Sequence, residues 1–214
     1  VVDKINCLNL STITVANLGD MIAGNIHLPI RLNSRIDIIT QLIQVAELLA
    51  EFLNLLSQYV TVKYISGIDN HSRVSSNKQD SLESENLYRI IDWYLEARVP
   101  HIEFLSNKLD CKDIAEREIL KHKIGFIHGH KDGQTKIIEK INSFTGSKFD
   151  LICSAHYHHF SSKEEYDTIS IANGSLMGID EYAYDLRLRA KPSQTLIEIS
   201  RDNVVESIHK INLD

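Results

Sequence analysis

The stretch Cys153–His159, with the sequence CSAHYHH, places three histidines within four residues, directly after the apolar run Phe149–Ile152. On a helix, His156 and His158 would point in different directions. On a loop at the end of a strand they can face neighbouring metal ions. Considered alone, the stretch is equally compatible with a solvated histidine-rich turn. It predicts a buried strand that ends in a polar loop, and the other strand ends of the chain decide between the two readings.

Three other stretches share this design, because in each an apolar run ends abruptly in glycine, aspartate, asparagine or histidine. They are Thr14–Leu18 before Gly19–Gly24, Val60–Ile65 before Ser66–Arg73, and Ile124–Ile127 before His128–Gly133. We interpret each as a β-strand that runs into a polar loop at its carboxyl end. Strand ends that deliver oxygen and imidazole groups to one edge of a sheet are how an α/β protein builds a metal centre.

The ordered motifs Gly19–Asp20, Asn70–His71, His128–His130 and His156–His158 resemble those of the calcineurin-like metallophosphoesterase superfamily. The resemblance implies an α/β fold, a metallophosphoesterase-like β-sandwich flanked by helices. It also implies a dinuclear centre that hydrolyses phosphoesters, with two divalent ions about 3.5 to 4 Å apart. Manganese is the expected metal, with iron, zinc or magnesium as alternatives.

The resemblance also assigns roles to single residues. The second metal of the family has four protein ligands, and this sequence matches them with Asp20, Asn70, His128 and His156. Asp20 would bridge the two ions, and His158 would bind the first. His71 corresponds to the general-acid histidine of the family, a role suited to a side chain that titrates near neutrality.

Substrate contacts are expected from Asn70 and from Arg73. The planar donors of Arg73 suit a phosphate oxygen, although an exposed, solubilising arginine is an equal alternative.

The first metal site is incomplete in this sequence. The family supplies an aspartate and a histidine from an N-terminal D-x-H motif, but the only carboxylate before Asp20 is Asp3, which is followed by Lys4 and Ile5. We expect residues 1–214 to form a single metallophosphoesterase domain. Either this domain has lost its first strand, or the protein works with one metal or none. We favour the first explanation because Val1 is not an initiator methionine, and the absent motif leaves the activity of this chain open.

Two further positions depart from the family pattern. Asp69 stands where glycine is usual, and it would either orient His71 or accept the turn geometry. Ala155 also replaces glycine, which is tolerable if its φ is negative. His130 and His159 have no family role, and each is expected to contact a metal-binding residue or solvent. The remaining histidines are expected to be structural or exposed: His27, His101, His122 and His209.

The C-terminal part of the chain contains the segments Asn173–Gly178, Asp180–Ala183 and Lys191–Thr195. They resemble phage and prophage phosphoesterases related to DNA-repair exonucleases, a resemblance that covers nearly the whole chain and implies DNA phosphodiesters as substrates. A glycine-rich turn that allows close backbone approach is the alternative interpretation of the first segment.

Composition bounds the function. A formal net charge of -6 gives no support for broad attraction to nucleic acid. Three cysteines without paired spacing fit a reducing cytoplasm, and no apolar run reaches the length of a membrane span. We therefore expect a metal-dependent phosphodiesterase or nuclease that acts on DNA. The alternatives are a small-substrate phosphatase, a cyclic-nucleotide phosphodiesterase, or a catalytically impaired binding or structural module. A homo-oligomer is compatible with each of these functions.

Hydrophobic periodicity predicts helices and strands in alternation, with more strands in the second half. The expected helices are residues 1–10, 35–57, 85–97 and 135–144, and the expected strands are 14–18, 60–65, 101–105, 114–120, 123–127, 149–153, 166–172, 196–199 and 204–208.

Overall fold

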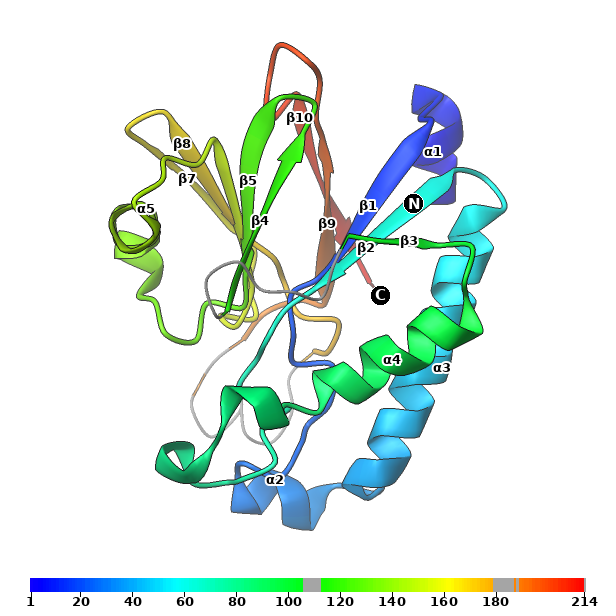
Figure 1. Ribbon diagram of the computed structural model, residues 1–214, viewed down its shortest axis with the longest axis vertical. Coiled ribbons are helices and arrows are strands. Elements are labelled where there is room, and N and C mark those ends of the chain that lie inside the picture. Colours follow the sequence, from blue (N-terminus) through cyan, green and yellow to red (C-terminus); the bar gives the residue numbers. More distant parts are fainter. Residues whose placement is uncertain (106–112, 179–186, 188, 214) are drawn as a thin grey trace. The chain divides into compact units, whose positions relative to one another are not determined.

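The computed structural model describes residues 1–105, 113–178, 187 and 189–213 and forms two compact units, Val1–Lys108 and Leu109–Asp214 (Figure 1). Each unit has its own sheet and its own buried apolar cluster. The expectation of a single domain over residues 1–214 stays a prediction. The segment Asp180–Ala183, singled out in the sequence, lies outside the described residues.

Unit 1 is built on a parallel three-stranded sheet with the order β1-β2-β3. Its elements are α1 (Val2–Leu8), β1 (Thr12–Asn17), α2 (Leu28–Asn33), α3 (Ile38–Ser57), β2 (Thr61–Ser66), α4 (Tyr88–Arg98) and β3 (Glu103–Phe104), with 3₁₀ turns at Lys78–Asp80 and Glu83–Glu85. α3 and α4 pack side by side (Figure 1) and share one apolar cluster with the Val62 and Tyr64 side of β2.

The long helix α3 begins three residues later than expected. The carboxylate of Asp37 accepts hydrogen bonds from the backbone N–H groups of Ile39 and Thr40, which makes Asp37 the N-cap. Asn33 and Ser34, which precede the expected helix, belong to the end of α2. Length and composition alone would allow α3 to cross a membrane. One of its faces, which includes Leu53, is packed in the core of unit 1.

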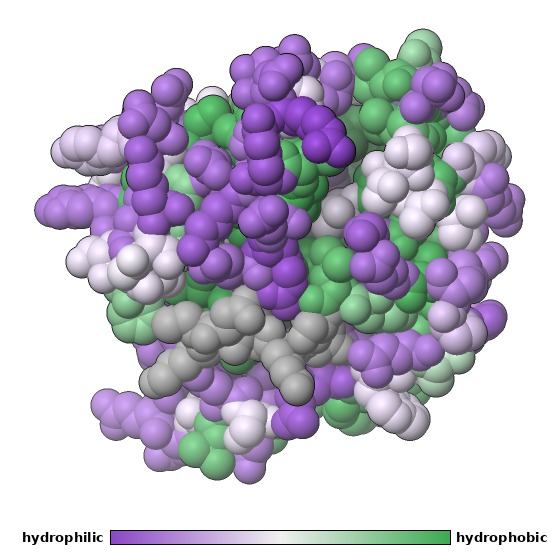
Figure 2. Space-filling model, turned by 45° about the horizontal axis from the view of Figure 1, so that its top comes forward, coloured by the Kyte–Doolittle hydropathy of each residue, from purple (hydrophilic) through white to green (hydrophobic). Residues whose placement is uncertain are grey.

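Other large apolar side chains of unit 1 remain exposed, among them Ile43 of α3 and Trp93 of α4. On the face drawn in Figure 2, hydrophobic and hydrophilic side chains interleave. Scattered exposure of this kind is ordinary for a folded protein.

Unit 2 contains a mixed five-stranded sheet with the order β4-β5-β6-β8-β7, in which β5, β6 and β8 are parallel. Its elements are β4 (Ile114–Ile119), β5 (His122–Ile127), a 3₁₀ turn (Gln134–Lys136), α5 (Ile137–Thr145), β6 (Leu151–Ser154), β7 (Ser161–Glu165), β8 (Thr168–Ala172), and the hairpin of β9 (Ser193–Glu198) and β10 (Ser207–Asn212). One face of α5 packs on the sheet through Ile137, Ile138 and Ile141.

Several sequence-based boundaries in unit 2 need correction, and β9 begins at Ser193 where residue 196 was expected. β7 was not expected, because its sequence SSKEE contains no apolar residue, a composition compatible with its place at the edge of the sheet. Tyr166, expected within a strand, lies with Asp167 in the turn between β7 and β8, where both residues have positive φ. The last strand begins at Ser207 and not at Val204.

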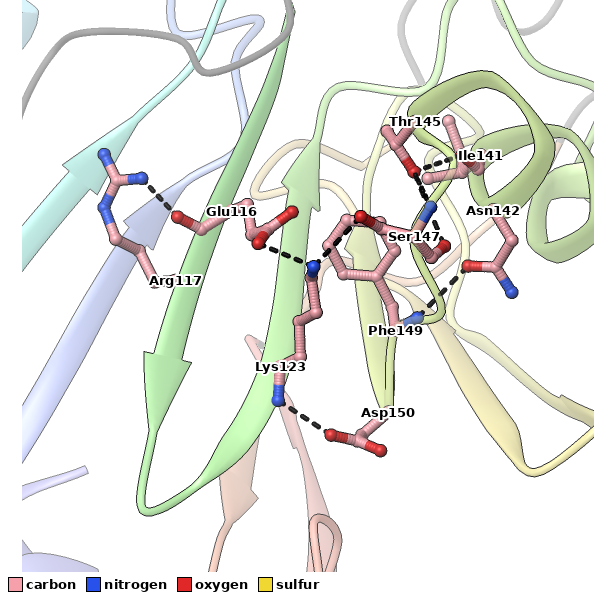
Figure 3. Close-up of polar contacts among 9 residues, drawn as sticks. All are labelled: Glu116, Arg117, Lys123, Ile141, Asn142, Thr145, Ser147, Phe149 and Asp150. Atoms are coloured by element: carbon pink, nitrogen blue, oxygen red, sulfur yellow. Dashed lines mark hydrogen bonds and ion pairs between the residues drawn. The ribbon is translucent and has the colours of Figure 1, made fainter.

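A polar network joins β5 to the segment that leads into β6 (Figure 3). The backbone N–H of Lys123 donates to Asp150 Oδ2 at 2.7 Å, while its Nζ lies 3.0 Å from Ser147 Oγ and 2.8 Å from Glu116 Oε1. The ring of Phe149 lies beneath this network and against Gly125, where an added Cβ would come within 3.2 Å of the ring. The network and the ring thus link β5 to the segment before β6, the two strands that precede the histidine loops.

We expect Phe149→Ala to lower the free energy of unfolding by about 3 to 5 kcal/mol, because it removes a fully buried ring and leaves a cavity. Phe144→Ala is the matched control, since Phe144 is exposed, and it is expected to cost at most about 0.5 kcal/mol. Urea unfolding followed by fluorescence measures both. Equal losses for the two variants would contradict the assigned core.

Candidate functional site

The parallel pairing of β1 with β2 places two loops at one edge of the unit 1 sheet. Asn17 pairs with Ser66 at the ends of the two strands, so the loops that carry Asp20 and Asn70–His71 leave the sheet side by side. The backbone N–H of His71 donates to Asp20 Oδ1 at 3.4 Å. The structure thus brings together the residues that the sequence placed at two separate strand ends.

Asp20 is held in a strained backbone conformation. Its φ is 54° and that of Gly19 is 98°, values in the left-handed region that only glycine adopts freely. The Asn17 side chain stabilises this turn because its Oδ1 accepts a hydrogen bond from the Gly19 N–H at 3.0 Å. Strain of this type persists when neighbouring contacts over-determine it, and it is frequent at functional sites.

The His71 ring is oriented by the loop after Asp20. Its Nδ1 lies 2.8 Å from the carbonyl oxygen of Ala23, and because a carbonyl only accepts, Nδ1 carries the proton. Nε2 is therefore the ring nitrogen available to another group. Gly24 makes this approach possible, since a Cβ at that position would lie 2.1 Å from the His71 carbonyl oxygen.

His27, which the sequence left as structural or exposed, belongs to this cluster. Its ring centroid lies 5.6 Å from that of His71 in an edge-on arrangement. Burial lowers the pKa of His27, the positive charges of His71 and Arg73 lower it further, and Asp20 raises it. No sequence motif marks His27, because it lies in a segment with no family pattern and is brought to His71 by the turn into α2.

Asp69 and Arg73 shape the loop that carries His71. Asp69 is buried and accepts hydrogen bonds from the N–H and the hydroxyl of Ser72, at 2.6 and 2.8 Å. These bonds stabilise the turn, which is the second of the two roles expected for Asp69. Arg73 donates from Nε to the backbone carbonyl of Asn70 at 3.1 Å. Arg73 thereby steadies the Asn70 backbone, a role that the sequence did not indicate.

A cavity of about 320 Å³ adjoins this loop. Gly24, which touches His71, and Asn25 form one wall, and Arg31 and Arg35 lie on another, next to the first residues of α3. Neither arginine forms an ion pair within the described part of the chain. The cavity therefore presents two positive charges together with the carboxylate of Asp37, which accepts hydrogen bonds from the first turn of α3.

In unit 2, the parallel strands β5, β6 and β8 end at one edge of the sheet, and backbone hydrogen bonds connect the loops that follow them. The Ala155 N–H donates to the His128 carbonyl at 3.0 Å, and the Asn173 N–H donates to the Ser154 carbonyl at 2.7 Å. The Ser175 N–H reaches the His158 carbonyl at 3.3 Å. The segment Asn173–Gly178 is thus a turn beside the histidine loop.

Three histidine rings gather at this edge. The ring of the buried His128 lies 5.0 Å from that of His156 and 5.3 Å from that of His130, between centroids. The His130 and His156 centroids are 6.3 Å apart. His130, which had no family role, is therefore a neighbour of both expected ligands.

His158 and His159 are exposed and lie outside this group of rings. The Nδ1 of His159 bonds its own loop, at 2.8 Å from the Tyr157 carbonyl.

The histidine loop is strained in the same way as the aspartate loop. His156 and His158 have φ values of 70° and 59°, whereas Ala155 has no positive φ, as its replacement of glycine requires. Cys153, at the end of β6, is buried, and burial raises the pKa of its thiol to about 12.

The chain resembles a curated protein in sequence and solved structures in fold. No protein-family model matches the chain. The chain is 26% identical over 205 residues to the SPbeta prophage-derived uncharacterized protein YonJ of Bacillus subtilis strain 168. This match covers 91% of the chain and 51% of YonJ, so the chain spans about half the length of that curated relative.

Among solved structures, a novel archaeal phosphodiesterase has a TM-score of 0.52 at 16% identity, with 99% of this chain and 88% of that chain covered. Vps29 from Entamoeba histolytica, complexed with zinc, has a TM-score of 0.45 at 14% identity, with 95% and 98% covered. The likeness to the archaeal phosphodiesterase, together with helix-flanked sheets in an α/β chain, confirms the expected metallophosphoesterase-like fold class.

We expect Gly24→Ala to lower the free energy of unfolding by about 1 to 3 kcal/mol, because the residue has a φ of 68° and its Cβ would overlap the His71 carbonyl. Gly67→Ala is the control. A Cβ at Gly67 meets nothing within 4 Å and its φ is not positive. Thermal unfolding of the two variants should differ clearly, and a Gly24→Ala protein as stable as Gly67→Ala would contradict the packing described.

Proposed function

We propose that the chain is a metal-dependent phosphoester hydrolase. The observation that carries this proposal is that each unit gathers metal-binding side chains at the carboxyl ends of its parallel strands. Unit 1 contributes Asp20 with the Asn70–His71 loop, and unit 2 contributes the His128–His156 pair. A carboxylate, an amide oxygen and two imidazoles form a ligand set suited to a divalent transition metal.

In this proposal Asp20, Asn70, His128 and His156 bind one divalent cation. For a second cation only Asp20 and His158 remain from the family pattern, and two protein donors are few for a transition ion. We therefore expect one firmly bound ion and one weakly bound ion. When bound, the metal supplies positive charge that neutralises the phosphate oxygens and activates water for attack.

The protein groups perform the remaining steps. His71, with Nδ1 held by the Ala23 carbonyl, has Nε2 free to give a proton to the leaving oxygen when the ring is protonated. The lowered pKa of His27 disfavours a second positive charge beside a protonated His71. Arg73 keeps the Asn70 backbone in place, and its remaining guanidinium nitrogens can donate to a phosphate oxygen.

For the substrate we propose a phosphodiester with a second anionic group, such as the neighbouring phosphate of a DNA strand. The Arg31–Arg35 cavity supports this choice, because Gly24 joins it to the His71 loop. The acidic balance of -6 argues against a large basic face. A single subsite for one further phosphate is compatible with both observations. The relative YonJ is derived from a prophage, a setting in which DNA is at hand.

We expect Mn²⁺-dependent hydrolysis of bis(p-nitrophenyl) phosphate that falls at least about 100-fold in Asp20→Asn, since catalytic groups at a metal centre contribute effects of that size. Asp202→Asn, at an exposed carboxylate in unit 2, is the control. Steady-state rates and metal content after dialysis are the measurements. Full activity in Asp20→Asn, or in excess chelator, would refute the proposal.

The double variant Arg31→Ala/Arg35→Ala is expected to raise KM for a short single-stranded DNA at least about tenfold and to leave KM for bis(p-nitrophenyl) phosphate unchanged. Loss of two phosphate contacts should also reduce the slope of log KM against log salt by about 1.4. Arg201→Ala/Lys210→Ala removes the same charge from unit 2 as a control. Equal effects on both substrates would favour the small-substrate alternative.

A further inference from the structure

A buried carboxyl group of unit 1 lies behind the candidate site and has no part in the reaction proposed above. Asp92 of α4 is only 1% exposed. It accepts hydrogen bonds from the Ser66 hydroxyl and, at 3.4 Å, from the Tyr64 hydroxyl. Within the described residues, Asp92 forms no ion pair with a lysine, arginine or histidine.

The two hydroxyls connect Asp92 to both loops of the site. Asn17 Nδ2 donates to the Tyr64 hydroxyl at 3.0 Å, and Asn17 Oδ1 in turn accepts from the N–H of Gly19, the residue before Asp20. Ser66 is the last residue of β2, from which the loop to Asn70 and His71 departs. All of Asn17, Tyr64 and Ser66 are buried.

In this series of hydrogen bonds, every donor points toward Asp92 from Asn17 onward, and Asn17 itself accepts from Gly19. An ionised Asp92 accepts from Tyr64, Tyr64 accepts from Asn17, and Asn17 accepts from Gly19. An amide at position 92 would donate through its nitrogen. One of the two hydroxyls would then have to accept a bond in place of donating it, and the order of the chain would be disturbed at Tyr64 or at Ser66.

A purely structural role would not require a carboxylate at this position. Burial raises the pKa of Asp92 to about 7, with a further increase from Glu96, although Ser66 and Tyr64 lower it. Tyr88, on the same helix, experiences the charge of Asp92 as well. Keeping this group ionised at neutral pH costs free energy that an uncharged residue would avoid.

We propose that Asp92 is a positioning residue for the site, which holds the Asp20 loop through Tyr64, Asn17 and Gly19 and the His71 loop through Ser66. This inference rests on the proposed hydrolase function. It adds a dependence of the reaction on a carboxyl group that touches neither substrate nor metal.

The test compares Asp92→Asn and Tyr64→Phe with Glu96→Gln, which removes the same charge from an exposed position one turn further along α4. We expect kcat with bis(p-nitrophenyl) phosphate and Mn²⁺ to fall at least tenfold in the first two variants, with KM within threefold of the wild type. Glu96→Gln should keep the wild-type kcat.

Stability separates positioning from a merely structural role. The raised pKa of Asp92 means that the folded wild type binds this proton more tightly than the unfolded chain does, so the wild type loses stability as the pH rises from about 4 to about 7. Asp92→Asn has no such loss. The urea midpoint of Asp92→Asn minus that of the wild type should therefore increase as the pH rises over this range, and the difference should stay constant above about pH 7. The kcat of the variant should stay low throughout.

Two outcomes would overturn the proposal: kcat within twofold of the wild type in Asp92→Asn and in Tyr64→Phe, or a loss of kcat that only follows a loss of folded protein. If the wild type hydrolyses no phosphoester, the hydrolase proposal fails, and the amide NMR signals of Gly19 and Asp20 then decide on Asp92 alone. They should shift in Asp92→Asn and Tyr64→Phe but not in Glu96→Gln, and unchanged signals in all three variants would also overturn the proposal.

Discussion

The parallel pairing of neighbouring strands is the constraint on which the candidate site depends. Backbone hydrogen bonds fix β1 against β2 with Asn17 opposite Ser66, and β5 against β6 with Phe126 opposite Cys153. Parallel pairing directs both carboxyl ends of a pair to the same edge, so the loops that follow must lie next to each other. Motifs that are about fifty residues apart in unit 1 meet for this reason alone.

Both units use strained backbone to present their polar groups. Asp20 in unit 1 and His156 and His158 in unit 2 have left-handed φ values, each of which costs of order 1 kcal/mol or more for a residue with a side chain. Contacts that hold the loops offset this cost: Asn17 to Gly19 in one unit and Ala155 to His128 in the other. Left-handed residues also occur in turns elsewhere, such as Leu120 and Tyr166, so the strain accompanies the motifs without being confined to them.

The interior of unit 1 combines apolar packing with a polar line directed at the site. Leu53, Ile91 and Leu95 have the burial of an ordinary core, yet Tyr64 and Asp92 lie among them with their polar atoms bonded to each other. Such polar groups stabilise less than apolar ones of the same size, but they orient what they touch. The glycine at position 24 acts in the opposite way, by leaving room where a side chain would displace His71.

The sequence by itself determined the strand-to-loop transitions, the presence of the long helix α3 and the identity of Asp20, His71, His128 and His156 as candidates, because hydrophobic periodicity and motif residues can be recognised in the sequence alone. It did not reveal β7 or the start of β10, since edge strands with polar residues have little apolar alternation. Only the tertiary structure decided that His27 lies beside His71, that His130 lies beside His128, that Arg73 bonds the Asn70 backbone, and that Asp92 reaches Gly19 through Tyr64. The approach of His27 to His71 and of Asp92 to Gly19 joins segments far apart in sequence and is set by packing, which no local pattern encodes. The contacts of His130 with His128 and of Arg73 with Asn70 are close in sequence, but they depend on irregular loop conformations that hydrophobic periodicity does not predict.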